Sequence, residues 1–107
     1  PTELLLASIA SCLTLTLSIY AEAMGVKADN IEIDVEGDLD SAGMKGSPRV
    51  RPGYQNIRTK ISVETNVPED VFQQVVDLAL LRCPVEDSVK KGVAFEEPEV
   101  LIKKIEN

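Results

Sequence analysis

Two cysteines, Cys12 and Cys83, carry the side chains best suited to chemistry in this sequence. A thiolate is both a nucleophile and a metal ligand, and two thiols can also form a disulfide. The chain contains no histidine, which removes Ser–His and Cys–His catalysis and most zinc sites. The two cysteines lack CxxC spacing, which excludes a four-cysteine metal site and a thioredoxin-type motif. If this chain does chemistry, its two thiols are the leading candidates.

Cys83 stands directly before Pro84, at the start of a predicted short helix over Val85–Lys91. The residue before a proline is disfavoured in the α region, so Cys83 should cap this helix. The free N–H groups and positive dipole end of a helix N-terminus lower the pKa of a thiol. Arg82 acts in the same direction, whereas two acidic residues in the first turn oppose it. Local sequence alone leaves a reactive and an inert Cys83 equally open.

Cys12 lies near the middle of Pro1–Gly25, a stretch that is apolar on nearly every helical face. Such a helix has to be covered by other structure, because no face of it suits water. A cysteine in the middle of an apolar helix is more often an inert packing residue, and burial raises its pKa. Local sequence therefore favours packing for Cys12 over reactivity.

One pattern supports the reactive alternative for Cys12. Ser8 and Thr16 lie one helical turn before and after it, on the same stripe of the helix. Their hydroxyl groups could donate hydrogen bonds to a thiolate. Leu5, Ile9 and Ile19 would line an apolar approach, which would admit a hydrophobic substrate and exclude charged ones.

Two segments predict the strands that complete the core. Residues 30–37 and 56–65 both alternate apolar and polar side chains, which indicates half-buried strands. The outward residues are acidic in the first segment and mainly basic in the second, which favours antiparallel pairing. Between them, residues 38–55 are rich in Gly, Pro and Ser and predict a loop with turns.

The second half of the chain predicts a further helix and a last strand. Pro68 opens the helix, and an apolar stripe at helical spacing indicates core packing by Val71, Phe72, Val75, Val76, Ala79 and Leu80. Glu99–Ile105 predicts a final strand.

Composition limits the partners. The 107 residues suit one small domain, and the net charge of −7 argues against nucleic acid, because neutralising phosphates requires a basic surface. The apolar start of the chain could also be a membrane span or a lipoprotein signal. However, no basic residue precedes it and Glu22 and Lys27 close it, so we expect no membrane partner and a cytoplasmic location. A basic segment upstream of Pro1 would support export instead.

Three motifs, in order, carry a resemblance to a known family: PTELLLASIASC, RPGYQNIRTKISVET and RCPVEDSVKKGV. Together they resemble the OsmC/Ohr family of osmotically inducible and organic hydroperoxide resistance proteins. There, an apolar helix carries the first cysteine, and a C-P-V motif opens a later helix with the second. The resemblance covers almost the whole chain, and it is closest to the general OsmC-like group.

The resemblance implies an α+β fold with a long central helix carrying Cys12, a small antiparallel sheet, and an intertwined homodimer that buries the helix. It also implies a thiol peroxidase. The Cys12 thiolate would attack an organic hydroperoxide and become a sulfenic acid, and Cys83 would then form a disulfide that an external dithiol reductant reopens. Neither a metal nor another cofactor is expected. Substrate contacts are expected from Leu5, Ser8, Ile9 and Thr16.

The chain departs from the family pattern at its start. We expect residues 1–107 to form a single OsmC-like domain without the N-terminal strands of the family, and the family's upstream arginine has no counterpart to which it can be assigned. Thr2 follows the opening proline where the Ohr branch has glutamate. Glu3, one position on, lies roughly opposite Cys12 on a continuous helix and is expected to be a capping acid.

Two other functions remain open for the same fold. The protein could be a binding protein with an apolar groove at the dimer interface and no turnover. It could also be a redox sensor that uses the disulfide as a signal. The preferred hydroperoxide and the physiological reductant are not encoded in any motif of the sequence.

Overall fold

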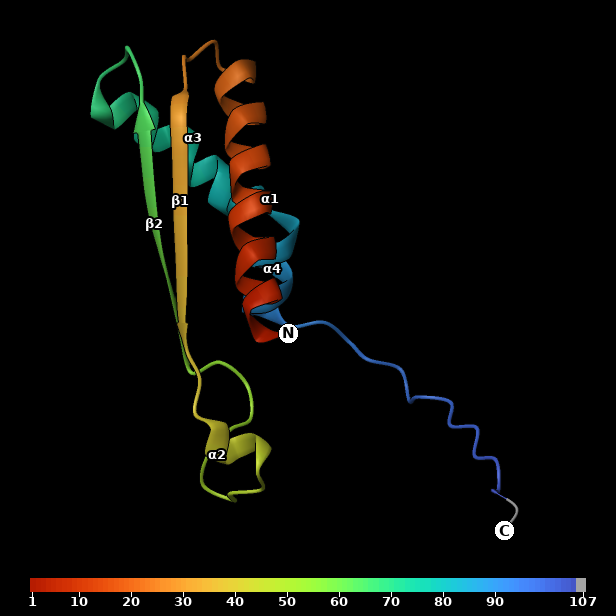
Figure 1. Cartoon of the computed structure of the whole chain (residues 1–107). Helices are drawn as coiled ribbons and strands as arrows, with labels where there is room; N and C mark the ends of the chain where they lie inside the picture. The colour runs from red at the N-terminus through yellow and green to blue at the C-terminus, as the bar shows by residue number, and fades with distance from the viewer. Residues whose placement is uncertain (106–107) are drawn as a thin grey trace.

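A computed structural model of the chain describes residues 1–105 and shows one long helix beside a two-stranded sheet, followed by shorter helices (Figure 1). The elements in chain order are α1 (Thr2–Ala23), β1 (Asp29–Asp38), α2 (Ser41–Met44), β2 (Asn56–Glu64), α3 (Glu69–Arg82) and α4 (Pro84–Lys91). This arrangement confirms the predicted α+β class with a long N-terminal helix and a small antiparallel sheet.

Helix α1 ends close to the predicted glycine. Gly25 has a φ of 68° and donates its backbone N–H to the Glu22 carbonyl, while Val26 donates to Ala21. A left-handed glycine just after the last turn satisfies carbonyl groups that the helix itself leaves unpaired. The chain can therefore reverse at once and enter β1.

Only one stripe of α1 is buried within the chain. Its buried residues recur every three or four positions: Ile9, Leu13, Thr16, Leu17 and Ala21. Elsewhere on the helix, Leu4, Leu15 and Ile19 are more than half exposed. The expectation that the whole helix would be covered is therefore not met by a single copy of the chain.

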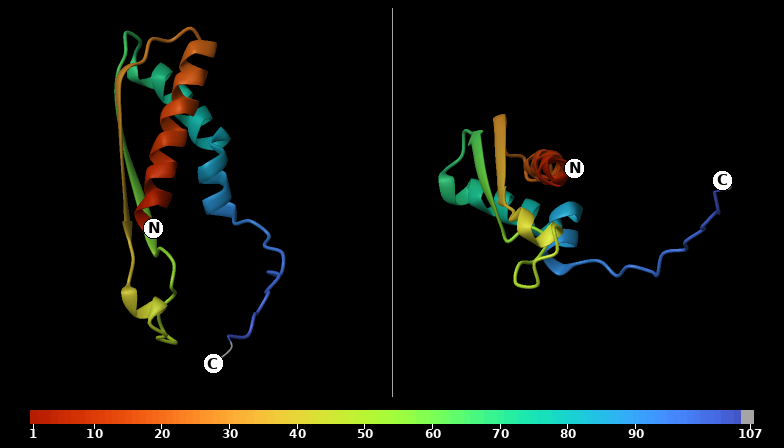
Figure 2. Two further views of the ribbon diagram at one scale, coloured as in Figure 1. Left: turned by 45° about the vertical axis from the view of Figure 1, so that its right-hand side comes forward. Right: turned by 60° about the horizontal axis from the view of Figure 1, so that its bottom comes forward.

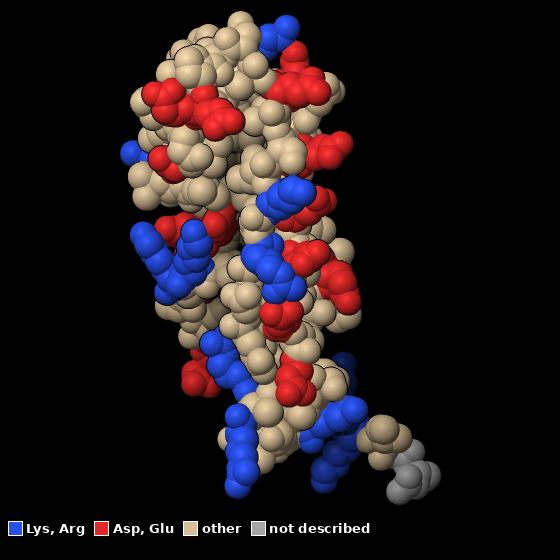
Figure 3. Space-filling model, turned by 90° about the vertical axis from the view of Figure 1, so that its left-hand side faces the viewer, with Lys and Arg blue, Asp and Glu red and all other residues tan. Residues whose placement is uncertain are grey.

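The two strands pair antiparallel in the register that their charges favour. Ile33 lies opposite Ile61, Asp34 opposite Lys60, and Glu36 opposite Arg58. The Arg58 side chain reaches Glu36 at 3.1 Å and Asp38 at 2.9 Å. Figure 3 shows the acidic and basic side chains next to one another along one face of the molecule. These exposed pairs contribute little free energy each, but they favour this register over its alternatives.

The predicted loop between the strands contains the short helix α2 and a firm attachment to α1. Asp40 caps α2 by accepting a hydrogen bond from the Ala42 N–H at 2.9 Å. The Tyr54 hydroxyl donates to the Thr2 carbonyl at 2.7 Å. Its ring crosses the backbone at Gly37, where a Cβ atom would lie 2.6 Å from a ring carbon, so only glycine fits there.

The core has two parts, both built on the buried stripe of α1. At one end, Leu17 and Ala21 pack against α3 in a cluster completed by Phe72, Val75 and Ala79. At the other end, Ile9 and Leu13 pack around Cys83, where α3 gives way to α4. Figure 2 shows α3 and α4 running behind α1 as two consecutive helices. The predicted apolar stripe of α3 is confirmed as core.

The predicted final strand over Glu99–Ile105 is wrong for the chain as described. These residues form no strand and extend away from the body (Figures 1 and 2). Their apolar side chains are largely exposed, from 68% at Val100 to 90% at Ile105. A strand requires a neighbour that accepts its backbone hydrogen bonds, and none lies beside this segment among residues 1–105. The apolar residues of this segment have a high propensity for strands, but propensity alone does not provide a neighbouring strand.

Core packing on α1 yields a stability prediction. Leu17→Ala removes a side chain that is 1% exposed, and it should lower the free energy of unfolding by about 2–5 kcal/mol through lost burial and a cavity. Urea denaturation followed by circular dichroism measures this loss. Leu81→Ala on α3, where the side chain is 67% exposed, is the control and should change stability by less than about 0.5 kcal/mol. Equal losses in the two variants would contradict this assignment of the core.

Candidate active site

The packing of α4 against α1 brings the two cysteines into one apolar cluster. Cys83 ends α3 and caps α4 in an extended conformation (φ −70°, ψ 113°), as predicted for the residue before Pro84. Its side chain is fully buried, whereas Cys12 is half-buried, and both thiols are free. Ile9, Leu13 and Leu80 are among the apolar residues around the pair.

The surroundings of Cys12 favour its thiolate. Burial raises the pKa of Cys12, but hydrogen bonding from the Cys83 side chain, the Val85 N–H and the Thr16 hydroxyl outweighs burial and lowers it. The charge of Glu86 opposes this effect. The N–H donor from the start of α4 therefore acts on Cys12 across the helix interface.

Cys83 has the opposite tendency. Burial raises the pKa of its thiol, and the hydrogen bond and charge of Cys12 raise it further, although the N–H groups of Glu86 and Val85 act in the other direction. Cys12 therefore loses its proton more readily than Cys83 does. This difference suits Cys12 as nucleophile and Cys83 as the protonated partner.

The folded chain shifts the pKa values of the two thiols in directions that differ from those favoured by local sequence alone. Local sequence favoured inert packing for Cys12, and it directed the helix N-terminus toward Cys83. In the folded chain, the pKa of Cys12 falls and that of Cys83 rises, because the start of α4 packs on the middle of α1. A contact between segments so far apart in sequence leaves no local signal.

The two predicted hydroxyl groups occupy different surroundings. Thr16 is buried, and its Oγ1 lies 3.9 Å from the Cys12 Sγ while donating to the Cys12 carbonyl at 2.7 Å. This hydroxyl proton can turn to the sulfur when the sulfur carries charge. Ser8 is exposed and donates to the Leu4 carbonyl at 2.8 Å, within its own helix.

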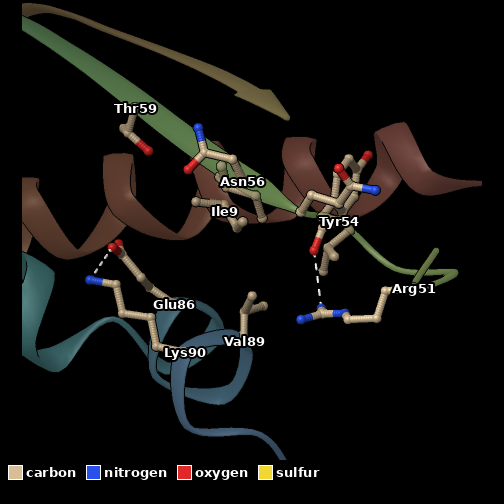
Figure 4. A pocket seen from close by; sticks show the side chains of 11 residues that line it. Ile9, Arg51, Tyr54, Asn56, Thr59, Glu86, Val89 and Lys90 are labelled. Carbon is tan, nitrogen blue, oxygen red and sulfur yellow. Dashed lines mark hydrogen bonds and ion pairs between the residues drawn. The ribbon is translucent and has the colours of Figure 1, made fainter. Parts of the chain in front are cut away.

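A cavity of about 450 Å³ adjoins the thiol cluster (Figure 4). Leu5 and Ile9 on α1 line it as predicted for the apolar approach, together with Ile57 on β2 and Val89 on α4. Ile9 belongs both to this wall and to the cluster around Cys83, whereas neither cysteine is part of the cavity lining. Ile19, the third residue expected at the approach, is 53% exposed and lies outside this lining.

Polar side chains complete the cavity wall. Arg51 and Tyr54 come from the loop before β2, and the Arg51 Nη2 donates to the Tyr54 carbonyl at 3.0 Å. Glu86 and Lys90 lie across from them on α4 and form an ion pair of 2.7 Å (Figure 4). The sequence placed Glu86 only in a first turn, and it assigned no site role to Arg51, Tyr54 or Lys90. The RPGY segment within a long loop was the one signal available for two of them.

Glu3 lies in the first turn of α1 with its side chain exposed. Hydrogen bonds from its own backbone N–H and from the Thr2 hydroxyl lower the pKa of its carboxyl group. This is the environment expected of a capping acid.

Two further properties concern membrane spanning and metal binding. Helix α1 is long and apolar enough, by length and composition alone, to cross a membrane, a test that the core helix of a soluble protein and a signal sequence also pass. Among residues 1–105, no three His, Cys, Asp or Glu side chains gather into a group able to hold a metal ion.

The Thr16 contact leads to a titration prediction. Thr16→Val removes a donor that favours the charged form of Cys12, so the pKa of Cys12 should rise. The measurement is the rate of iodoacetamide alkylation against pH, with the two cysteines separated by peptide mass mapping. Thr14→Val is the matched control, since its exposed hydroxyl makes the same bond to a carbonyl one turn back, that of Ala10. If the pH midpoint of Cys12 alkylation is unchanged in Thr16→Val, the Thr16 hydroxyl does not contribute to the pKa of Cys12.

Comparison with known proteins places the fold. The family model described as OsmC-like protein matches residues 1–97. The chain is similar to the crystal structure of an OsmC-like protein from Mycoplasma pneumoniae, with 20% identity and a TM-score of 0.75 over 86% of this chain and 62% of that one. It is also similar to an OsmC-like hydroperoxide resistance protein from Jannaschia sp. CCS1, with 16% identity and a TM-score of 0.76 over 94% and 66%.

The chain thus spans about two thirds of the length of either structural relative. No curated protein sequence matches it. The family match extends from the helix that carries Cys12 through the helix that Cys83 caps, and both relatives share this arrangement of elements. The chain belongs to the OsmC-like protein family.

Proposed function

We propose that this protein is a thiol-dependent peroxidase that reduces organic hydroperoxides to alcohols, with Cys12 as nucleophile and Cys83 as resolving thiol. The observation that carries the proposal is the thiol pair itself. Two free thiols share one apolar cluster, and their pKa values are shifted in opposite directions. Membership of the OsmC-like family supports a peroxidase-type role, as does a structural relative described as a hydroperoxide resistance protein.

The first step oxidises Cys12. Its thiolate attacks the outer oxygen of R–O–OH, an S–O bond forms, and the O–O bond breaks. The alkoxide takes up a proton and leaves as the alcohol. Cys12 remains as a sulfenic acid, having supplied the two electrons that reduce the peroxide. A lowered pKa increases the fraction of Cys12 present as the attacking thiolate.

The second step returns the protein toward its starting state. The Cys83 sulfur attacks the sulfur of the Cys12 sulfenic acid, forming the S–S bond while the S–O bond breaks and water leaves with the proton of Cys83. An external dithiol then reduces the disulfide by exchange and restores both thiols. The chemistry requires no metal or other cofactor.

The cavity beside the thiols supports an organic rather than an inorganic peroxide. Leu5 and Ile9 form part of an apolar wall suited to a hydrocarbon group, and Thr16 lies at the Cys12 sulfur. Ser8, one turn before Cys12, remains a predicted substrate contact. A binding protein that uses the same cavity without turnover is the alternative, and a redox sensor would share the thiol chemistry but differ in its partner.

Two properties of the whole protein belong to the proposal. The exposed apolar side chains of α1, among them Leu4 and Leu15, are suited to burial against a second copy in a homodimer. We also propose a cytoplasmic protein, since a reducing compartment keeps both thiols available.

A single-turnover experiment tests the peroxidase. One equivalent of cumene hydroperoxide is added to the reduced protein, and intact mass after thiol alkylation counts the remaining thiols. The parent should lose both thiols within seconds and two mass units in total, as an intramolecular disulfide forms. The Cys83→Ser variant should stop at a Cys12 sulfenic acid, which dimedone traps.

Cys12→Ser supplies the control, because Cys83 alone should stay alkylatable under the same treatment. Two thiols still alkylatable in the parent after several minutes would refute turnover and favour the binding protein. Fast oxidation that no dithiol reverses would favour neither a peroxidase nor a reversible sensor.

The homodimer has its own measurement. Sedimentation velocity on the parent should give twice the mass of one chain. Leu15→Glu places a charge on the exposed apolar side of α1, where the leucine is 63% exposed, and should shift the protein toward the mass of one chain. A parent that sediments as one chain at micromolar concentration would contradict the dimer.

A further inference from the structure

Helix α4 carries two ion pairs of the same kind in different surroundings. Glu86 pairs with Lys90 at 2.7 Å, and Asp87 pairs with Lys91 at 3.1 Å, each across one helical turn. The Glu86 side chain is 12% exposed, whereas that of Asp87 is 49% exposed. Only the first pair lines the cavity beside the thiols (Figure 4).

The Glu86 carboxylate is only half satisfied. Its Oε1 accepts from Lys90, but its Oε2 is buried and has no hydrogen-bond partner among the residues that the structure describes. A buried carboxylate oxygen without a donor costs free energy, and such atoms gather at functional sites in native proteins. The Glu86 charge also acts on Cys12, where it opposes formation of the thiolate.

We propose that the Glu86–Lys90 ion pair controls the charge on Cys12. Lys90 offsets part of the Glu86 charge, which favours the Cys12 thiolate, and loss of Lys90 would expose Cys12 to more of that negative charge. Glu86 is thus a positioning residue that acts through its charge and takes no part in bond making. The effect of the ion pair on the pKa of Cys12 does not depend on the proposed peroxidase function. Only the conclusion that the pair controls reactivity toward peroxide rests on that function.

Other titratable and charged groups lie on the elements that pack around the thiols and the cavity. Cys83 faces it directly from the junction of α3 and α4. Arg51 and Tyr54 line the far side of the cavity, where Arg51 is held by the Tyr54 carbonyl. From the sheet, Ile33, Val35 and Ile57 pack against the cluster. Glu86 is the carboxylate whose charge raises the pKa of Cys12, and Lys90 is its ion-pair partner.

The test is the pH midpoint of Cys12 alkylation by iodoacetamide, read by peptide mass mapping without any peroxide. Glu86→Gln removes the opposing charge and should lower the midpoint by about 0.5–1 unit. Well below the midpoint, this shift gives a roughly three- to tenfold larger thiolate fraction. Lys90→Gln should raise the midpoint, and Lys90→Arg, which keeps the pair, should restore it.

The second ion pair supplies matched controls. Asp87→Asn and Lys91→Gln change the net charge by the same amounts on the same helix, and they should move the midpoint by less than about 0.2 unit, because exposed charges are screened. In the double variant Glu86→Gln with Lys90→Gln, the effect of losing Lys90 should disappear.

Three outcomes would overturn the proposal. Equal shifts in Glu86→Gln and Asp87→Asn would show a response to net charge alone. No shift in Glu86→Gln, with circular dichroism unchanged, would show that the carboxylate does not act on Cys12. A shift from Lys90→Gln that persists without Glu86 would assign the effect to Lys90 itself. A protein inert toward peroxide could still show every expected shift, so this test and that of the peroxidase fail independently.

Discussion

The site depends on one contact, that of the N-terminus of α4 with the middle of α1. Pro84 forces the chain out of α3 at Cys83, and the first N–H groups of the new helix then face the sulfur atoms. At Cys12 these donors outweigh the effect of burial on the pKa, whereas at Cys83 burial prevails. Without this contact, Cys12 would lose the N–H donor of Val85, and its pKa would be higher. The apolar stripe of α1 and the packing of α3 serve to hold the two helices in this arrangement.

The burial of the pair explains why one environment yields two different thiols. Cys83 is completely buried, and burial raises its pKa, so Cys83 holds its proton more firmly than Cys12 does. Cys12 is half-buried and has the Thr16 hydroxyl beside it as a further donor. A nucleophile has to be reached by its substrate, whereas a resolving thiol has only to reach the nucleophile. The difference in exposure therefore matches the opposite directions in which the two pKa values shift.

Much of the fold could be predicted because local sequence patterns determine it. The alternation over 30–37 and 56–65 predicted both strands, and the charges on them favoured the antiparallel pairing that the structure has. The proline at 84 predicted the start of α4. The final strand failed, since propensity over Glu99–Ile105 does not supply a neighbouring strand. The site was predictable only in its cysteines and part of its apolar wall. The proposed role of Glu86 depends on its burial in the folded chain. Burial of this kind produces no periodic pattern in the sequence, so it could not be predicted.

The attachment of Tyr54 has a mechanical consequence. Its hydroxyl ties the loop before β2 to the first turn of α1, while its ring rests on the bare backbone of Gly37. This loop carries Arg51 and forms one wall of the cavity, and α1 carries Leu5 and Ile9 of another. The two walls are thus joined close to the helix start, and the hydrogen bond limits how far they can separate there.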